Sequence, residues 1–192
     1  MSKKIWIGLA VVLVVVVAGA AALFLTRPNN QANVPPLTQT FGDSPSGFTF
    51  RYPEDWRPFI PMQGLMVAGP PDTLNGATPG PSFTIQRAGP VSVYDSLDAA
   101  FNDYLTKGAL SPQRQWHKLS EITHLTLQGR DTLVVDLQGL ENAASPEQRA
   151  RIYATTSQNT FVYYIILSAP VATWETDEPL LTAVMNSFQI LE

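Results

Sequence analysis

The hydrophobic residues of this chain fall into two patterns, one continuous run at the start and shorter periodic runs after it. The run from Ile5 to Leu25 consists almost entirely of Val, Ala, Leu and Ile and contains no charged side chain. As a helix it would rise about 31 Å at about 1.5 Å per residue, which matches a bilayer core of about 30 Å. We therefore expect a transmembrane helix at residues 5–25.

The charges on either side of this run predict its orientation. Lys3 and Lys4 precede it and Arg27 follows it, so the positive-inside rule places residues 1–4 in the cytoplasm and the rest of the chain outside. The expected localisation is the cell membrane, with a single span and an extracytoplasmic C-terminal domain. A cleaved signal peptide is the alternative, because Ala18-Gly19-Ala20 resembles a cleavage site. The apolar run is longer than the apolar region of a signal peptide, which has roughly 7–15 residues, and this favours a retained anchor.

Residues 26–46 have the composition of a linker. They are rich in Pro, Asn, Gln and Thr and show no apolar period, so they bury too little surface to fold alone. We expect a flexible tether here. One domain is expected over residues 47–192, which is enough chain for a single hydrophobic core.

The domain is expected to open with a half-buried strand. Phe48, Phe50 and Tyr52 share one face of residues 47–52, because successive side chains of a strand point to opposite faces. Pro53 ends the strand, and Trp56 is expected to fold back onto the core.

Two further apolar runs flank a segment rich in Pro and Gly. The runs, at residues 63–69 and 82–87, predict strands, and residues 70–81 between them predict a long exposed loop. This loop lacks the Lys of a phosphate-binding P-loop.

Two segments have helical periodicity. The first begins after Asp95 or Ser96, either of which can cap it, and ends before Gly108; the second covers Trp174 to Asn186. Their apolar stripes are Leu97, Phe101, Tyr104 and Leu105 in the first, and Leu180, Leu181, Val184, Met185 and Phe188 in the second.

The chain between these helices predicts antiparallel strands. One hairpin joins residues 119–128 to 132–140 through a turn at Gly129, and another joins 149–157 to 160–167. Residues 161–167 are apolar enough for a central strand buried on both faces. An edge strand at residues 188–191 is expected to close the domain. The predicted fold class is α+β, an antiparallel sheet flanked by helices.

Composition excludes several classes of function. The chain has no Cys, so it has neither disulfides nor a thiolate for zinc binding or nucleophilic catalysis. Residues 47–192 carry nine Lys and Arg against fifteen Asp and Glu. This acidic balance argues against nucleic acid as a partner.

No catalytic or metal-binding constellation is apparent. His117 and His124 are seven residues apart in strand-like sequence, which places them on opposite faces of a strand and keeps them from sharing an ion. No motif pairs a nucleophile with a base. We therefore expect no catalytic residue, metal or cofactor, and a protein that is not an enzyme.

Two short motifs frame the predicted domain. It opens with Gly-Phe-Thr-Phe-Arg-Tyr-Pro-Glu-Asp-Trp at residues 47–56, and Ser168-Ala169-Pro170 leads into a last helix that ends in Asn186-Ser187-Phe188-Gln189-Ile190. Together with the order of the elements between them, these motifs resemble the PsbP-like proteins. The resemblance implies an α/β/α sandwich, which photosystem II extrinsic subunits, DcrB-like bacterial lipoproteins and a Ran-binding nuclear import factor share. Most of these relatives are binding or assembly modules.

Two functions are compatible with these features. The first is a non-catalytic, membrane-anchored extracytoplasmic domain that docks on another protein and helps assemble or stabilise a membrane complex. The second is a domain that binds a small ligand or a lipid in a pocket between the 70–81 loop and nearby aromatic residues. The candidate binding surface consists of Trp56, Trp116, Pro70, Pro71, Asn75, Gly76 and Pro79.

Overall fold

The computed structural model describes residues 34–43, 47–112, 114–140, 145–158 and 160–191. The transmembrane helix expected at residues 5–25 lies outside the described residues and stays a prediction. None of the described helices is both long enough and apolar enough to cross a membrane.

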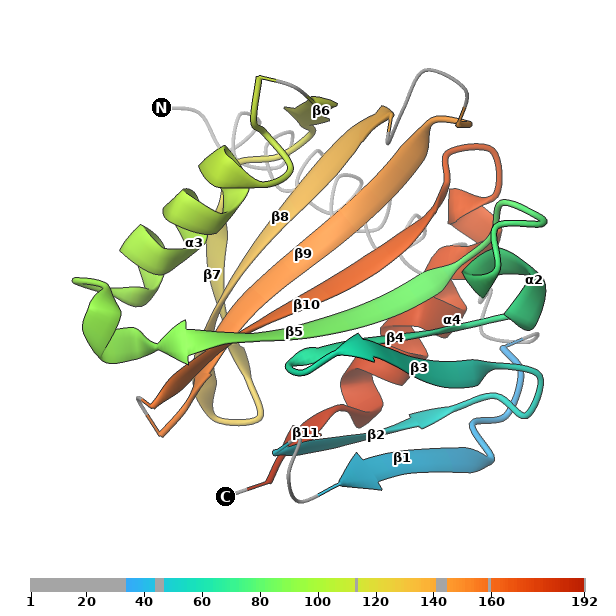
Figure 1. The fold of residues 1–192 in the computed structure, drawn as a ribbon, viewed down its shortest axis with the longest axis horizontal. Helices are drawn as coiled ribbons and strands as arrows, with labels where there is room; N and C mark the ends of the chain where they lie inside the picture. Colours follow the sequence, from blue (N-terminus) through green and yellow to red (C-terminus); the bar gives the residue numbers. More distant parts are fainter. Residues whose placement is uncertain (1–33, 44–46, 113, 141–144, 159, 192) are drawn as a thin grey trace, which may run out of the picture. The chain divides into compact units, whose positions relative to one another are not determined.

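The centre of the domain is an antiparallel eight-stranded sheet (Figure 1). Its strand order is β3-β4-β5-β10-β9-β8-β6, and β7 pairs with β8 beside β6. The strands are β3 (Arg57–Met62), β4 (Leu65–Gly69), β5 (Ser82–Pro90), β6 (Gln115–Lys118), β7 (Thr123–Leu127), β8 (Arg130–Leu140), β9 (Gln148–Ser157) and β10 (Phe161–Pro170).

The strand β10 confirms the prediction of a central strand. It pairs with β5 on one side and β9 on the other, and most of its side chains are buried, on both faces. Its sequence is apolar because neither face meets water. Pro170 is its last residue, as expected.

A smaller sheet consists of β1 (Gln39–Asp43), β2 (Phe48–Tyr52) and β11 (Gln189–Ile190). The strands at 48–52 and 189–190 confirm two predictions, whereas β1 lies inside the range expected to be tether. The domain therefore begins before residue 47. Phe41 of β1 packs on Phe48 and Phe50, with ring centroids 5.8 and 5.4 Å apart. The sequence did not predict β1 because Phe41 is its one large apolar residue, and a single such residue shows no period.

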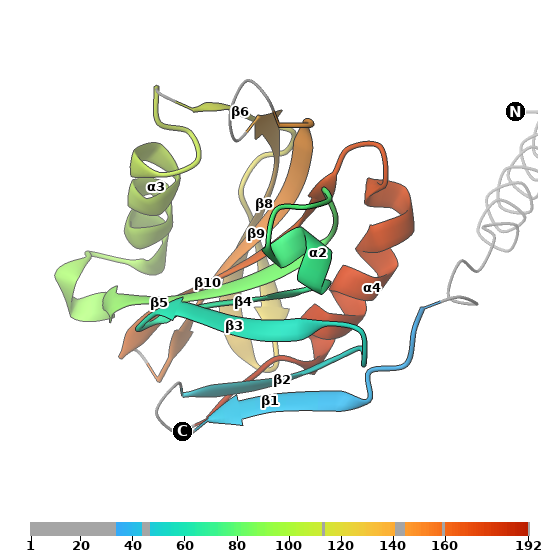
Figure 2. The same cartoon turned by 45° about the vertical axis from the view of Figure 1, so that its right-hand side comes forward.

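Helices cover both faces of the main sheet (Figure 2). On one face lie α4 (Trp174–Ser187) and the smaller sheet, and on the other lies α3 (Leu97–Lys107). The buried residues accordingly form two clusters, one on each side of the sheet. This arrangement confirms the antiparallel sheet flanked by helices.

The sequence signals for α3 act as expected. The Ser96 hydroxyl accepts a hydrogen bond from the Ala99 amide at 3.0 Å and so caps the first turn. Gly108 is the C-cap, and Phe101 and Leu105 are buried against the sheet. Ala100 is buried with them.

A charged network holds the first turns of α4 to the sheet. Arg151 of β9 donates to Asp136 of β8 at 2.7 Å and to Glu178 of α4 at 2.6 Å. The hydrogen bond with Asp136 is the main cause that raises the pKa of Arg151, so the guanidinium stays charged. The network ties three elements together at one place.

Two segments differ from prediction, residues 70–81 and residues 119–128. The first, expected to be a loop, contains α2 (Pro71–Leu74), a single helical turn. A 3-10 turn, η2 (Val91–Val93), follows β5. The expected strand 119–128 is shorter, because the chain leaves β8 after β6 and returns to it as β7. The β7–β8 hairpin closes through Gln128 and Gly129, both at positive φ (53° and 77°), which is the conformation that two-residue hairpin turns favour.

Candidate functional site

The main candidate site is an open cleft of about 850 Å³ on the face of the sheet that carries α3. The helix packs on β8 and β9, and Figure 1 shows that β10 and β5 extend beyond it. The exposed part of this sheet face is the floor of the cleft. Side chains of α3 and the segment after it line the cleft on one side, and the segment around α2 lines it on another.

The floor is built by alternate residues of three neighbouring strands. Phe83 and Ile85 of β5 point into the core beneath α4, so the residues between and beside them face the cleft. The floor residues are Ser82, Thr84 and Gln86 of β5, Ile166 and Ser168 of β10, and Gln148, Ala150 and Ile152 of β9.

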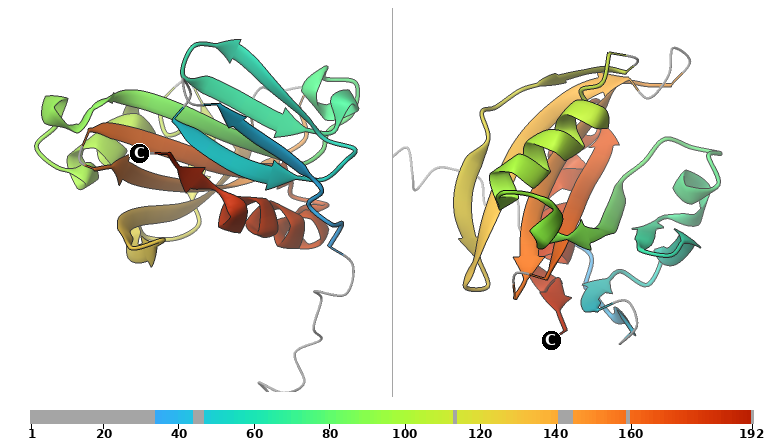
Figure 3. Two further views of the ribbon diagram at one scale, coloured as in Figure 1. Left: turned by 90° about the horizontal axis from the view of Figure 1, so that it is seen from below. Right: turned by 60° about the vertical axis from the view of Figure 1, so that its left-hand side comes forward.

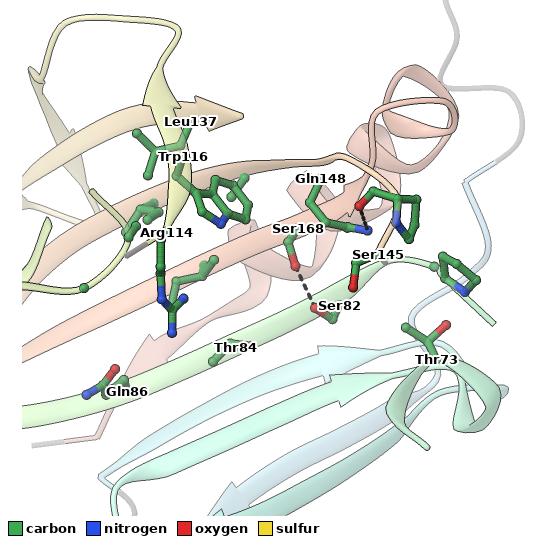
Figure 4. A pocket seen from close by; sticks show the side chains of 18 of the residues that line it. Thr73, Ser82, Thr84, Gln86, Arg114, Trp116, Leu137, Ser145, Gln148 and Ser168 are labelled. Atoms are coloured by element: carbon green, nitrogen blue, oxygen red, sulfur yellow. Dashed lines mark hydrogen bonds between the residues drawn. The ribbon is translucent and has the colours of Figure 1, made fainter. Parts of the chain in front are cut away.

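Hydroxyl groups form a polar strip on this floor. Ser82 and Ser168 are cross-strand partners, and their hydroxyl oxygens are 2.8 Å apart (Figure 4). Because partners in an antiparallel pair share a face, the register of β5 on β10 brings these two groups together. One end of the floor is thus polar, whereas Ile152 and Ile166 make another part apolar.

Trp116 adds an unsatisfied donor to the lining. Its indole Nε1 is buried and has no hydrogen-bond partner among the described residues. Leaving such a donor unpaired costs about 1–3 kcal/mol. The ring lies close to Gly139 of the paired strand β8, where a Cβ atom would collide with Trp116 and with the Gln115 carbonyl.

The charges around the cleft suit binding better than acid–base chemistry. Arg114 is the one ionised side chain among the described residues that line it; this lining contains no Asp, Glu, His, Cys or Lys. Burial is the main cause that raises the pKa of Tyr104, with Arg114 acting in the opposite direction. Its ring stacks on Tyr164 with centroids 3.9 Å apart, and Tyr104 is therefore a protonated packing residue at neutral pH.

The structure brings together only part of the predicted binding surface. Trp116, Gly76 and Pro79 line the cleft, although Trp116 is far from the other two in sequence. Pro70, Pro71 and Asn75 belong to the same α2 segment but are not in the lining.

Trp56, which was predicted to belong to the binding surface, does not line the cleft. It is 1% exposed and belongs to the core cluster on the opposite face of the sheet. The expectation that it folds back onto the core is confirmed.

The floor residues were missed by sequence reasoning. The signal was present in Ser82, Thr84 and Gln86, which alternate with Phe83 and Ile85. A polar face on a strand beside the central strand is typical of a sheet face left partly uncovered.

The two histidines lie on separate strands. His117 is in β6 and His124 is in β7, and His124 lies between two carboxylates. Its Nδ1 is 3.2 Å from Asp131 Oδ1, and its Nε2 is 3.3 Å from Asp98 Oδ1. The hydrogen bond with Asp131 is the main cause that raises the pKa of His124. Across the described part of the chain, no group of three or more His, Cys, Asp or Glu side chains is placed to hold a metal ion.

Sequence comparison leaves the chain without a match, whereas the fold has several. No protein-family model and no curated protein matches the sequence. The cyanobacterial PsbP (CyanoP) of Synechocystis sp. PCC 6803 superimposes with a TM-score of 0.55 at 15% identity, over 79% of this chain and 91% of that one. LpqN of Mycobacterium tuberculosis, described as involved in cell envelope biogenesis, has a TM-score of 0.53 at 17% identity, over 80% and 91%.

Two further solved structures have a similar fold. The Ran-binding protein Mog1p of Saccharomyces cerevisiae has a TM-score of 0.52 at 12% identity, over 80% of this chain and 95% of that one. A Bacteroides thetaiotaomicron protein has a TM-score of 0.55 at 13% identity over 82% of this chain, which spans 50% of that protein's length. Identities this low establish architecture alone. The described domain has the PsbP-like fold.

Proposed function

We propose that this chain is a membrane-anchored extracytoplasmic domain that binds another protein and helps assemble or stabilise a membrane complex. The anchor is the single span expected at residues 5–25, with the N-terminus in the cytoplasm. The binding site is the cleft on the α3 face of the sheet. One observation carries the proposal: α3 covers only part of this sheet face and leaves an open cleft of about 850 Å³.

The lining supports a binding role over a catalytic one. Its polar groups are hydroxyls, amides and one guanidinium, which hydrogen-bond a ligand but offer no general base near neutral pH. The fold supports the same proposal by analogy, since the yeast neighbour is described as Ran-binding. That description concerns the yeast protein, and a protein partner of this chain is part of our proposal.

Site-specific photo-crosslinking tests whether the cleft meets a partner. A photoreactive residue replaces Gln86, which lines the cleft, in the full chain within native membranes. The matched control replaces Gln138, which pairs with β6 through His117 and does not line the cleft. The proposal expects one discrete adduct with a membrane-complex subunit from position 86 and none from position 138. Equal adducts from both positions, or none from either, would contradict it.

A small ligand or lipid is the second candidate, and the volume of the cleft favours it. Ligand pockets typically enclose about 300–1,000 Å³, and Ile152 and Ile166 give the floor an apolar part. Native mass spectrometry of the purified full chain would then find a retained small molecule. Trp116→Phe, which replaces an indole of the cleft lining by a smaller ring, should reduce that adduct. Trp174→Phe is the control, because Trp174 is the first residue of α4 and lies in the core on the opposite face of the sheet.

A further inference from the structure

The edge strand β3 exposes large apolar side chains without a cover from the described domain. Phe59, Ile60 and Met62 are 57%, 50% and 64% exposed. In a soluble domain, single exposed apolar residues are ordinary, but a contiguous group of them marks an interaction site. Figure 3, left, shows β3 and β4 at the margin of the domain, outside β5.

The pairing of β3 with β4 shifts register between Phe59 and Met62, so the exposed side chains lie at an irregular part of the strand. Such a bulge bends a strand and disrupts its ladder, which disfavours the addition of a strand from a second copy. A lipid phase has no fixed shape and covers side chains that point in different directions.

The chemistry of the hairpin matches the interfacial region of a bilayer. The hairpin consists of β3 and β4, which are joined by a turn at Gln63-Gly64. Residues 58–71, which include most of this hairpin, contain no charged side chain. From Phe59 to Met62 the strand extends about 10 Å at about 3.3 Å per residue, so the exposed apolar side chains lie close together along this edge. Residues 47–192 carry a net negative charge, so their contact with a membrane would depend on apolar insertion rather than on attraction to anionic lipids.

The backbone of β3 permits shallow insertion and disfavours strand pairing. An edge strand carries unpaired N–H and C=O groups, which are costly in hydrocarbon. Pro58 and Pro61 have no N–H, which lowers that cost and also removes donors that a second copy would need for strand addition.

The bilayer is within reach of the hairpin. Thirteen residues, 26–38, separate the expected span from the first residue of β1, and at full extension they reach about 45 Å. We propose that the β3 edge, through Phe59, Ile60 and Met62, inserts into the headgroup region of the membrane that anchors the chain. This inference rests on the proposed anchor and adds a second membrane contact that would orient the domain.

Fluorescence depth measurement tests the proposal in the full chain. The chain has no Cys, so Met62→Cys introduces a unique attachment site for an environment-sensitive dye. Leu119→Cys is the matched control, since Leu119 is also apolar and exposed, at 44%, but follows β6. Both variants are reconstituted into phosphatidylcholine vesicles, with and without lipids that carry a doxyl quencher.

The proposal expects a blue-shifted emission at position 62 and several-fold stronger quenching by doxyl lipids than at position 119. Adding Ile60→Asp to the Met62→Cys chain should bring quenching to the control level, whereas adding Thr126→Asp should leave it unchanged. Water-like emission at position 62 would overturn the proposal. So would a blue shift without doxyl quenching, because a second copy or another protein would then cover the strand. Flotation of the vesicles tests the anchor separately, since a chain that fails to float contradicts the anchor and this inference together.

Discussion

Trp56 fixes the corner between the strand β2 and the strand β3. Its amide donates to the Pro53 carbonyl at 3.2 Å, and its side chain is buried in the core beneath α4. We expect Trp56→Ala to lower the free energy of unfolding by about 3–5 kcal/mol, as loss of a buried aromatic ring does. Urea denaturation followed by circular dichroism measures this. Trp56→Phe should cost less, and an unchanged midpoint for the Ala variant would contradict the assigned packing.

His124 provides a pH-dependent contact between α3 and the β7–β8 hairpin. Its folded pKa lies above the ordinary value of about 6.5 because Asp131, and to a lesser extent Asp98, favour the imidazolium. The stabilisation is therefore fully present below the unfolded pKa and is lost as pH rises through the folded pKa. NMR titration should find the pKa of His124 lowered more by Asp131→Asn than by Asp98→Asn. Equal titration in all three proteins would refute this assignment.

At the scale of elements, Gly139 lets β6 lie close to β8 and so positions Trp116. A Cβ atom at residue 139 would collide with the backbone of Gln115 and with Trp116. We expect Gly139→Ala to displace β6, to lower the melting temperature by several degrees and to weaken crosslinking from position 86. Gly89→Ala is the control, because nothing lies within 4 Å of its added Cβ. Identical melting of the two variants would contradict this role of Gly139.

Elements with a complete local signal were predictable, and those defined by distant partners were not. The helix α3 carries its cap, its stripe and its terminating glycine within residues 96–108, and β10 is a run of apolar and aromatic residues from Phe161 to Leu167. The strand β1 has one large apolar side chain and is fixed by its pairing with β2. The separation of β6 from β7 depends on how both return to β8.

The cleft was predictable only in part for the same reason. Its Trp116 and the 70–81 segment were identified because aromatic and Pro-rich stretches are conspicuous in a sequence. Its floor depends on the order of β5, β10 and β9 in the sheet and on α3 covering only some of that face. Neither property is encoded by a local period.

For the whole molecule, the proposed anchor would place the cleft at the membrane. Residues 5–25 are expected to remain in the mature protein, because the apolar run is longer than that of a signal peptide. Intact-mass measurement of the protein from membranes should find residues 1–25 still attached, and alkaline carbonate should not extract it. Deleting residues 5–25 should make it extractable. A mature mass lacking the first 20–25 residues would favour the signal peptide.

Filling the cleft with a large side chain tests whether the cleft binds a subunit of a membrane complex. Thr84→Trp places an indole on the cleft floor, whereas Thr126→Trp places the same group on the exposed strand β7. The measurement is the amount of partner subunit recovered with each full-length variant from solubilised membranes. We expect stoichiometric recovery with the wild type and Thr126→Trp and a loss of at least about tenfold, or about 1.4 kcal/mol, with Thr84→Trp. Equal recovery with both variants would contradict it.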